Sequence, residues 1–189
     1  LTSYCFHVSS SSGGEGLSSS NRACVMTGSE IEPGWVSTDA VSVTARGLSI
    51  YGSYDEEGSM DSFTIQKFET SSSEWAPVVS GTGADGTITA EIPEADTGSV
   101  NLYRTAILNN CSIVAITSAP ARNILLQSSV TGTRIDLRWN NPFPSDGAVF
   151  SVWRETGNGW EEIVSQVTDT VWSEDYSLFA QNISSANVA

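Results

Sequence analysis

The stretch that decides the fold is Tyr4-Cys5-Phe6-His7-Val8, together with its return Ala23-Cys24-Val25. Tyr4, Phe6 and Val8 fall on one face of an extended strand, and a loop of Ser, Gly and Glu separates the two runs. This pattern predicts a β-hairpin. Cys5 and Cys24 lie one on each strand, so a disulfide could cross-link the pair, which implies an oxidising compartment.

Alternating apolar residues continue along the rest of the chain. Phe63-Thr-Ile65 is one such run, and Ile135-Asp-Leu137-Arg-Trp139 is another, which Asn140-Asn141-Pro142 ends. Turn sequences such as Asp85-Gly86 and Asn158-Gly159 separate the runs. No segment places apolar residues at a spacing of about 3.6 over three turns. The sequence therefore predicts an all-β protein of antiparallel sheets.

The two halves of the chain repeat the same pattern. Phe63-x-Ile65-x-Lys67 matches Phe150-x-Val152-x-Arg154, and Trp75-x-x-Val78 matches Trp160-x-x-Ile163. Internal similarity of this kind indicates repeated modules.

Three units follow from the repeat. Residues 31–122 form a complete module, residues 123–189 supply the first five strands of a further module, and residues 1–30 supply a closing hairpin. The N-terminal Tyr4-x-Phe6-x-Val8 matches Tyr103-x-Thr105-x-Ile107 of the complete module. We therefore expect the chain to be cut out of phase with its modules.

Composition and charge narrow the range of expected binding partners. The chain has 22 acidic and 8 basic residues, a net charge of −14, and Lys67 is its only lysine. Nucleic acids and anionic membranes are poor partners, because phosphate contacts need basic patches. No apolar run approaches the roughly 18 residues of a membrane span. The acidity fits either an ordinary secreted surface or adaptation to salt.

The motifs resemble a known family. Leu137-x-Trp139-x-x-Pro142, Phe150-x-Val152-x-Arg154 and Trp160-x-x-Ile163 are similar to a fibronectin type III module, and residues 4–25 resemble its closing hairpin. The resemblance implies tandem fibronectin-III/Ig-like β-sandwiches. The middle module departs from the pattern, because Gly52 stands where the tryptophan is expected.

A narrower resemblance lies at the module junction. Cys111-Ser, Ser118-Ala-Pro and Asn123-Ile-Leu-Leu-Gln127 are similar to junctions in tandem repeats of large secreted Bacteroidota surface proteins, of the gliding-motility and type IX secretion-associated type. Such modules serve as spacers or adhesive stalks. The resemblance therefore implies an extracellular or cell-surface location.

Catalytic and metal-binding patterns are weak. His7 is the only histidine and lies in an alternating strand, and no Gly-x-Ser-x-Gly elbow occurs, so we expect no enzymatic activity. Asp55, Glu57 and Asp61 cluster the oxygen ligands that Ca²⁺ prefers, but they lack EF-hand spacing and also fit a solvated acidic loop. We expect no cofactor. Cys111 is either a buried thiol or bonded to a neighbour.

Two functions remain open. One is a structural stalk, adhesin or filament segment whose partners are copies of itself or adjacent modules. In this case the N-terminal hairpin of one copy could complete the open module of another, head to tail. The alternative is a carbohydrate-binding module that stacks surface glycans on Trp153 and Trp172, which lie out of phase with the expected core positions Val152 and Val171.

Overall fold

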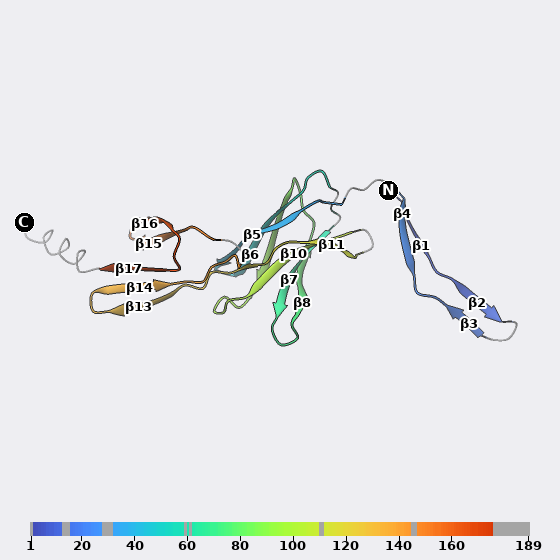
Figure 1. The fold of residues 1–189 in the computed structure, drawn as a ribbon, viewed down its shortest axis with the longest axis horizontal. Helices are drawn as coiled ribbons and strands as arrows, with labels where there is room; N and C mark the ends of the chain where they lie inside the picture. Colours follow the sequence, from blue (N-terminus) through green and yellow to red (C-terminus); the bar gives the residue numbers. More distant parts are fainter. Residues whose placement is uncertain are drawn as a thin grey trace, which may run out of the picture.

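The structure is a computed structural model that describes residues 2–12, 16–27, 32–58, 60, 62–109, 112–144 and 147–175. These residues form β-strands and connecting turns without a helix, which confirms the all-β prediction. Figure 1 shows three parts in a row: an N-terminal hairpin, a middle part and a C-terminal part. No helix that could cross a membrane is present among these residues.

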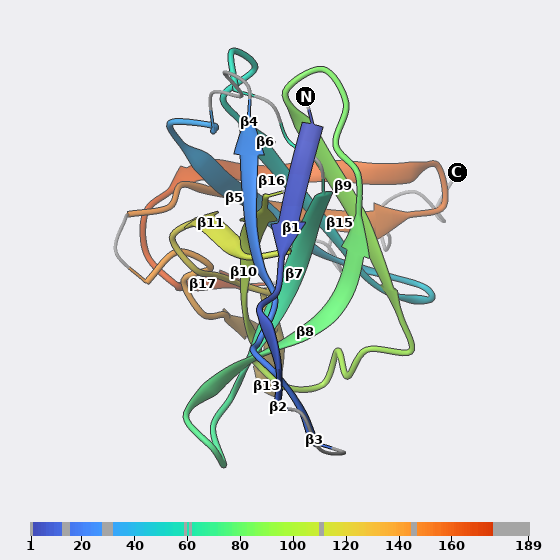
Figure 2. The same ribbon diagram turned by 90° about the vertical axis from the view of Figure 1, so that its right-hand side faces the viewer.

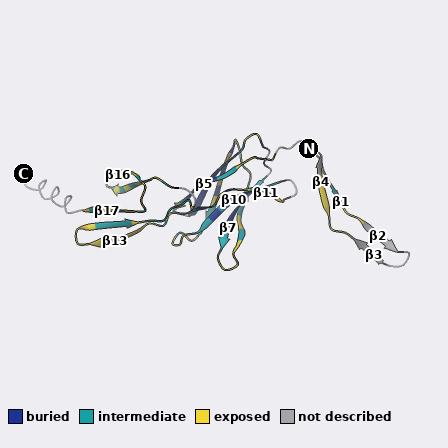
Figure 3. Ribbon diagram, in the orientation of Figure 1, coloured by how far each residue is buried: buried dark blue, intermediate teal, exposed yellow. Residues whose placement is uncertain are grey.

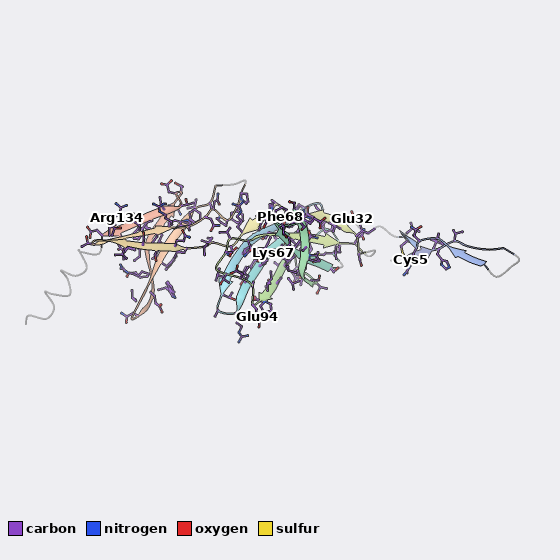
Figure 4. The ribbon with its side chains drawn as sticks, turned by 90° about the horizontal axis from the view of Figure 1, so that it is seen from below. Cys5, Glu32, Lys67, Phe68, Glu94 and Arg134 are labelled. Carbon is purple, nitrogen blue, oxygen red and sulfur yellow. A yellow bond between two sulfur atoms is a disulfide. The ribbon has the colours of Figure 1, made fainter. Side chains whose placement is uncertain are left out.

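The N-terminal part is a long antiparallel hairpin. Strand β1 (Thr2–Phe6) pairs with β4 (Ala23–Thr27), and β2 (Ser9–Ser12) pairs with β3 (Gly16–Ser19). The register sets Cys5 opposite Cys24, and the expected disulfide joins them. Figure 4 shows Cys5 on this hairpin, away from the middle part.

One face of this hairpin is apolar and bare. Phe6, Val8 and Val25 are 58%, 72% and 53% exposed. We call these three residues the hairpin face. Burial of apolar side chains away from water lowers the free energy. The hairpin face is therefore a candidate contact surface.

The middle part contains two antiparallel sheets. The first sheet has the order β5-β6-β9, and the second has the order β11-β10-β7-β8, with β12 pairing to the end of β10. The strands of the first sheet are β5 (Val36–Thr44), β6 (Gly47–Tyr54) and β9 (Thr87–Pro93). Those of the second are β7 (Ser62–Glu69), β8 (Glu74–Gly81), β10 (Leu102–Leu108), β11 (Val114–Thr117) and β12 (Ala121–Arg122).

These two sheets enclose a hydrophobic core. The apolar residues that reach the core alternate along the strands, as Leu48 and Ile50 do on β6 and Phe63 and Ile65 on β7. Figure 3 shows the buried segments gathered in this part of the molecule. The core cluster consists of Val41, Leu48, Ile50, Tyr54, Phe63, Ile65, Ile88, Ala90, Tyr103, Ile107 and Ala121.

A buried hydroxyl cluster links the two sheets. Thr38 Oγ1 lies 2.8 Å from both Thr105 Oγ1 and Ser118 Oγ. The backbone N–H of Thr105 donates to Thr38 Oγ1 (3.1 Å) and to Ser118 Oγ (3.0 Å). These contacts satisfy a backbone donor of β10 between its pairings with β11 and β12.

Gly52 has a steric reason to stand where the family pattern has tryptophan. A bulge in β5 between Thr38 and Ala40 shifts its register against β6. A Cβ on Gly52 would lie 2.5 Å from the carbonyl oxygen of Ser37. The bulged backbone of β5 therefore occupies the space that any side chain at position 52 would need.

The C-terminal part also contains two antiparallel sheets. One has the order β13-β14-β17, and the other contains β15 and β16, which lie at a different level from β13 in Figure 2. The strands are β13 (Gln127–Thr131), β14 (Arg134–Arg138), β15 (Phe150–Thr156), β16 (Gly159–Val167) and β17 (Val171–Asp175). Trp139 and Phe150 meet edge to face, with ring centroids 5.5 Å apart.

In the residues that the structure describes, the C-terminal part has five strands, three fewer than the eight of the middle part, and its strand orders match part of the middle part. The order β13-β14-β17 corresponds to β5-β6-β9, and β15-β16 corresponds to β7-β8. No strand among the described residues takes the place of β10 or β11. In residues 124–144 and 147–175 no side chain is fully buried, whereas the same arrangement in the middle part encloses a core.

Candidate functional site

The histidine and the acidic loop lie in separate parts of the molecule. His7 is exposed on the hairpin. In the acidic loop, Asp55 Oδ2 accepts from the backbone N–H of Gly34 (2.9 Å), and Asp55 Oδ1 accepts from that of Glu57 (3.2 Å). Both carboxylate oxygens of Asp55 thus hold the loop backbone. No cluster of metal ligands occurs among the residues that the structure places.

Two of the residues singled out by sequence, Asp61 and Cys111, lie outside the described residues.

The aromatic candidates are placed differently from the sequence interpretation. Trp153 is 51% exposed, as its phase against Val152 indicates. Trp172 is half-buried and pairs with Leu137, whereas Val171 is 52% exposed. The assumption that Val171 faces the core and Trp172 faces solvent is therefore wrong. Pairing with β14 decides which side of β17 faces inward.

A tryptophan that the sequence analysis did not propose for ligand stacking joins Trp153. Trp160 is 68% exposed, and the register of β15 with β16 sets Trp153 opposite Glu162 and Glu155 opposite Trp160. Residues two apart on a strand, and their cross-strand partners, share one face. The four side chains therefore lie on one face of the β15–β16 pair, with the two indoles diagonal to each other.

The first built site is the joint between the middle and C-terminal parts. Asn123 follows β12 and is 0% exposed. Its Oδ1 accepts from the backbone N–H of Asn101 (2.8 Å), and its Nδ2 donates to the carbonyl of Ser99 (2.9 Å). One side chain thus fixes the connecting segment to the loop that precedes β10.

Asn140 fixes the same segment from the C-terminal side. Its Nδ2 donates to the carbonyl of Asn123 (3.0 Å), and its Oδ1 accepts from the backbone N–H of Leu125 (2.8 Å). The two asparagines therefore bracket the connection on either side. Amide side chains suit this place because each offers both donors and acceptors to free backbone groups.

Backbone and apolar contacts complete the joint. The N–H of Arg122 donates to the carbonyl of Pro142 (2.7 Å), and Phe143 packs, partly buried, against the hydrophobic core of the middle part. We call Asn123, Asn140, Pro142, Phe143 and the residues that they contact the joint.

Sequence reasoning missed the joint. Asn140 and Pro142 indicated only the end of a strand, and Asn123 entered only as part of a junction motif, with no role for its side chain. No local pattern pointed to the side chains of Asn123 and Asn140. The partners lie 22 and 17 positions apart, so only the folded chain shows which groups meet.

The second built site is an apolar groove of about 170 Å³ in the C-terminal part. It follows the edge of β15 that β16 does not pair. The indole N–H of Trp139 is covered but has no acceptor among the described residues. We call this site the open groove, and its lining consists of Ile124, Leu126, Leu137, Trp139, Phe150, Ser151, Val152 and Trp153.

The middle part shows how the corresponding region looks when it is covered. There, β10 pairs with the equivalent edge of β7. Arg104 of β10 lies over the Trp75 ring at 4.3 Å and donates to Gln66 Oε1 at 2.8 Å, and burial lowers the pKa of its guanidinium. Trp160, which matches Trp75 in sequence, has no such cover, since it is 68% exposed.

An ion pair holds the two sheets of the C-terminal part together in the absence of a closed core. Arg154 of β15 contacts Glu174 of β17 at 3.2 Å and Glu161 of β16 at 3.3 Å. The side chain of Glu174 is 16% exposed, so this contact is screened less than a surface pair.

The sequence matches no family model, and no curated protein shows significant similarity to it.

Proposed function

We propose that this chain is a non-catalytic structural segment of a secreted cell-surface protein, a stalk, adhesin or filament built from fibronectin-III-like sandwiches. The strand orders β5-β6-β9 and β11-β10-β7-β8 support the fold assignment, because fibronectin type III and Ig domains pack a three-stranded sheet on a four-stranded antiparallel sheet in this manner. The disulfide supports an oxidising, extracellular location.

The joint is the observation that carries this proposal. Neighbouring domains in one chain usually move relative to each other unless their interface is extensive. Here Asn123 is fully buried, Asn140 bonds the connecting backbone twice, and Phe143 of the C-terminal part packs on the middle core. Such a joint keeps a fixed angle under thermal motion, which a spacer needs and an isolated binding module does not.

The test measures the rigidity of the joint. Spin labels are placed at Ser71→Cys, in the β7–β8 turn, and at Gly157→Cys, in the β15–β16 turn, both in a Cys111→Ser background. Pulsed electron paramagnetic resonance should give one narrow distance distribution, as narrow as that of a control pair within the middle part, Ser71→Cys with Thr82→Cys. A distribution several times broader than the control would contradict the spacer role.

Carbohydrate binding is a second candidate, favoured by Trp153 and Trp160. Two exposed indoles on one face, flanked by Glu155 and Glu162, offer a stacking surface with hydrogen-bond acceptors for sugar hydroxyls. Glycan-array binding that is lost in both Trp153→Ala and Trp160→Ala, but kept in Val171→Ala, would support this function. Equal binding by all three variants, or none by the unmodified chain, would contradict it.

A further inference from the structure

We propose that the β1–β4 hairpin of one copy pairs, in a second copy, with the edge of β15 that no described strand pairs, and fills the open groove. The inference rests on the proposed structural role and names its partner, a second copy of this chain. Three observations carry it: the bare hairpin face, the open groove, and a middle part that displays the completed arrangement.

The middle part supplies the template. Its β10 pairs with β7 in the register Ile107 opposite Phe63 and Thr105 opposite Ile65. All four side chains are 2% exposed or less, so this pairing closes the core. In the C-terminal part, Phe150 and Val152 occupy the places of Phe63 and Ile65 and line the open groove instead.

The template predicts the register of the intermolecular pairing. Tyr4-x-Phe6-x-Val8 matches Tyr103-x-Thr105-x-Ile107 in sequence. Val8 should therefore lie opposite Phe150, and Phe6 opposite Val152. This register brings the hairpin face into the open groove beside Leu137 and Trp139, while the Cys5–Cys24 disulfide lies on the other face.

The two surfaces suit strand addition. Strand addition supplies main-chain hydrogen bonds along the β15 edge, and the groove supplies side-chain specificity.

The occupant is a second copy because of where the two surfaces lie. The β1–β4 hairpin exposes Phe6, Val8 and Val25, and Figure 1 shows the middle part between this hairpin and the C-terminal part. A head-to-tail contact between identical chains is heterologous, so it repeats from copy to copy into a filament, or into a ring where the rotation between copies closes. Each copy carries a net charge of −14, so added salt should strengthen the assembly by screening the repulsion.

Sedimentation velocity of the 189-residue chain over a concentration series provides the first test. The unmodified chain should form a ladder of oligomers that grows with concentration. Phe6→Ser should raise the concentration for half-assembly about 10- to 100-fold, because a buried phenyl group is lost. The matched control, Arg22→Ser on the same hairpin, should assemble normally. A monomer at all concentrations, or equal assembly by both variants, would overturn the proposal.

Disulfide trapping tests the register and the partner. His7 and Ser151 correspond to the paired residues Ala106 and Thr64, so single variants His7→Cys and Ser151→Cys, mixed in a Cys111→Ser background, should form a cross-linked dimer. Arg22→Cys mixed with Ser151→Cys should not. Equal cross-linking by both mixtures would contradict the register.

A chain that carries both substitutions, His7→Cys and Ser151→Cys, separates the two possible occupants. On oxidation it should form a covalent ladder. An internally linked monomer would show that the hairpin closes on its own groove, against the proposal. The spin-label experiment reports on the joint independently of assembly. A chain that stays monomeric but gives a narrow distance distribution would contradict the assembly alone. A chain that forms the ladder but gives a broad distance distribution would contradict the rigid-spacer role alone.

Discussion

Asn140→Ala should loosen the joint without unfolding either part. The substitution removes the two hydrogen bonds to the connecting segment, one from Nδ2 to the carbonyl of Asn123 (3.0 Å) and one from the N–H of Leu125 to Oδ1 (2.8 Å), besides a long local one to the carbonyl of Asn141 (3.5 Å). Each such bond contributes about 1 kcal/mol net, so the docked orientation should lose about 2 kcal/mol. This corresponds to roughly a 30-fold rise in the population of undocked orientations.

The assay is the same spin-label pair at Ser71 and Gly157. The distance distribution should broaden markedly in Asn140→Ala and remain narrow in Asn21→Ala, where the asparagine is exposed on the hairpin. The melting temperature of the middle part should change little, because its core cluster does not include Asn140. An unchanged distribution in Asn140→Ala would refute the argument that these amide bonds fix the angle.

Two further predictions concern the middle part. Gly52→Ala should lower the free energy of unfolding of the middle part by about 1–3 kcal/mol, since the new Cβ would lie 2.5 Å from the Ser37 carbonyl oxygen. Urea denaturation measures this change. An unchanged free energy of unfolding would mean that the backbone of β5 moves aside without cost. A hydrogen bond from the Ser99 hydroxyl lowers the pKa of Asp96. Asp96 therefore contributes stability above the unfolded-state pKa of about 4, and this is lost as pH falls through the lower folded-state value, so Asp96→Asn should flatten the acid side of the stability profile. If Asp96→Asn leaves the loss of stability at low pH unchanged, Asp96 does not cause it.

Local pattern explains the elements that sequence analysis predicted correctly. Strands such as β7, β14 and β15 follow from alternation, because side-chain period along an extended chain is a property of a few neighbouring residues. The Cys5–Cys24 disulfide could be predicted for the same reason, since a hairpin brings its two strands together whatever the rest of the molecule does.

Other features depend on partners that are distant in sequence. The reversed placement of Val171 and Trp172 follows from the pairing of β17 with β14, and the missing side chain at Gly52 follows from a bulge in β5. Trp160 is exposed because no strand among the described residues covers it as β10 covers Trp75 with Arg104.

By itself, the sequence determined that the chain forms antiparallel strands, that one hairpin is cross-linked, and that two segments share a strand pattern, because each depends on spacing along the chain. Only the tertiary structure decided which faces are covered, that Asn123 and Asn140 fix the connection, and that one groove is left open beside β15. Burial and amide bonding depend on which segments meet in space, and no local pattern specifies that.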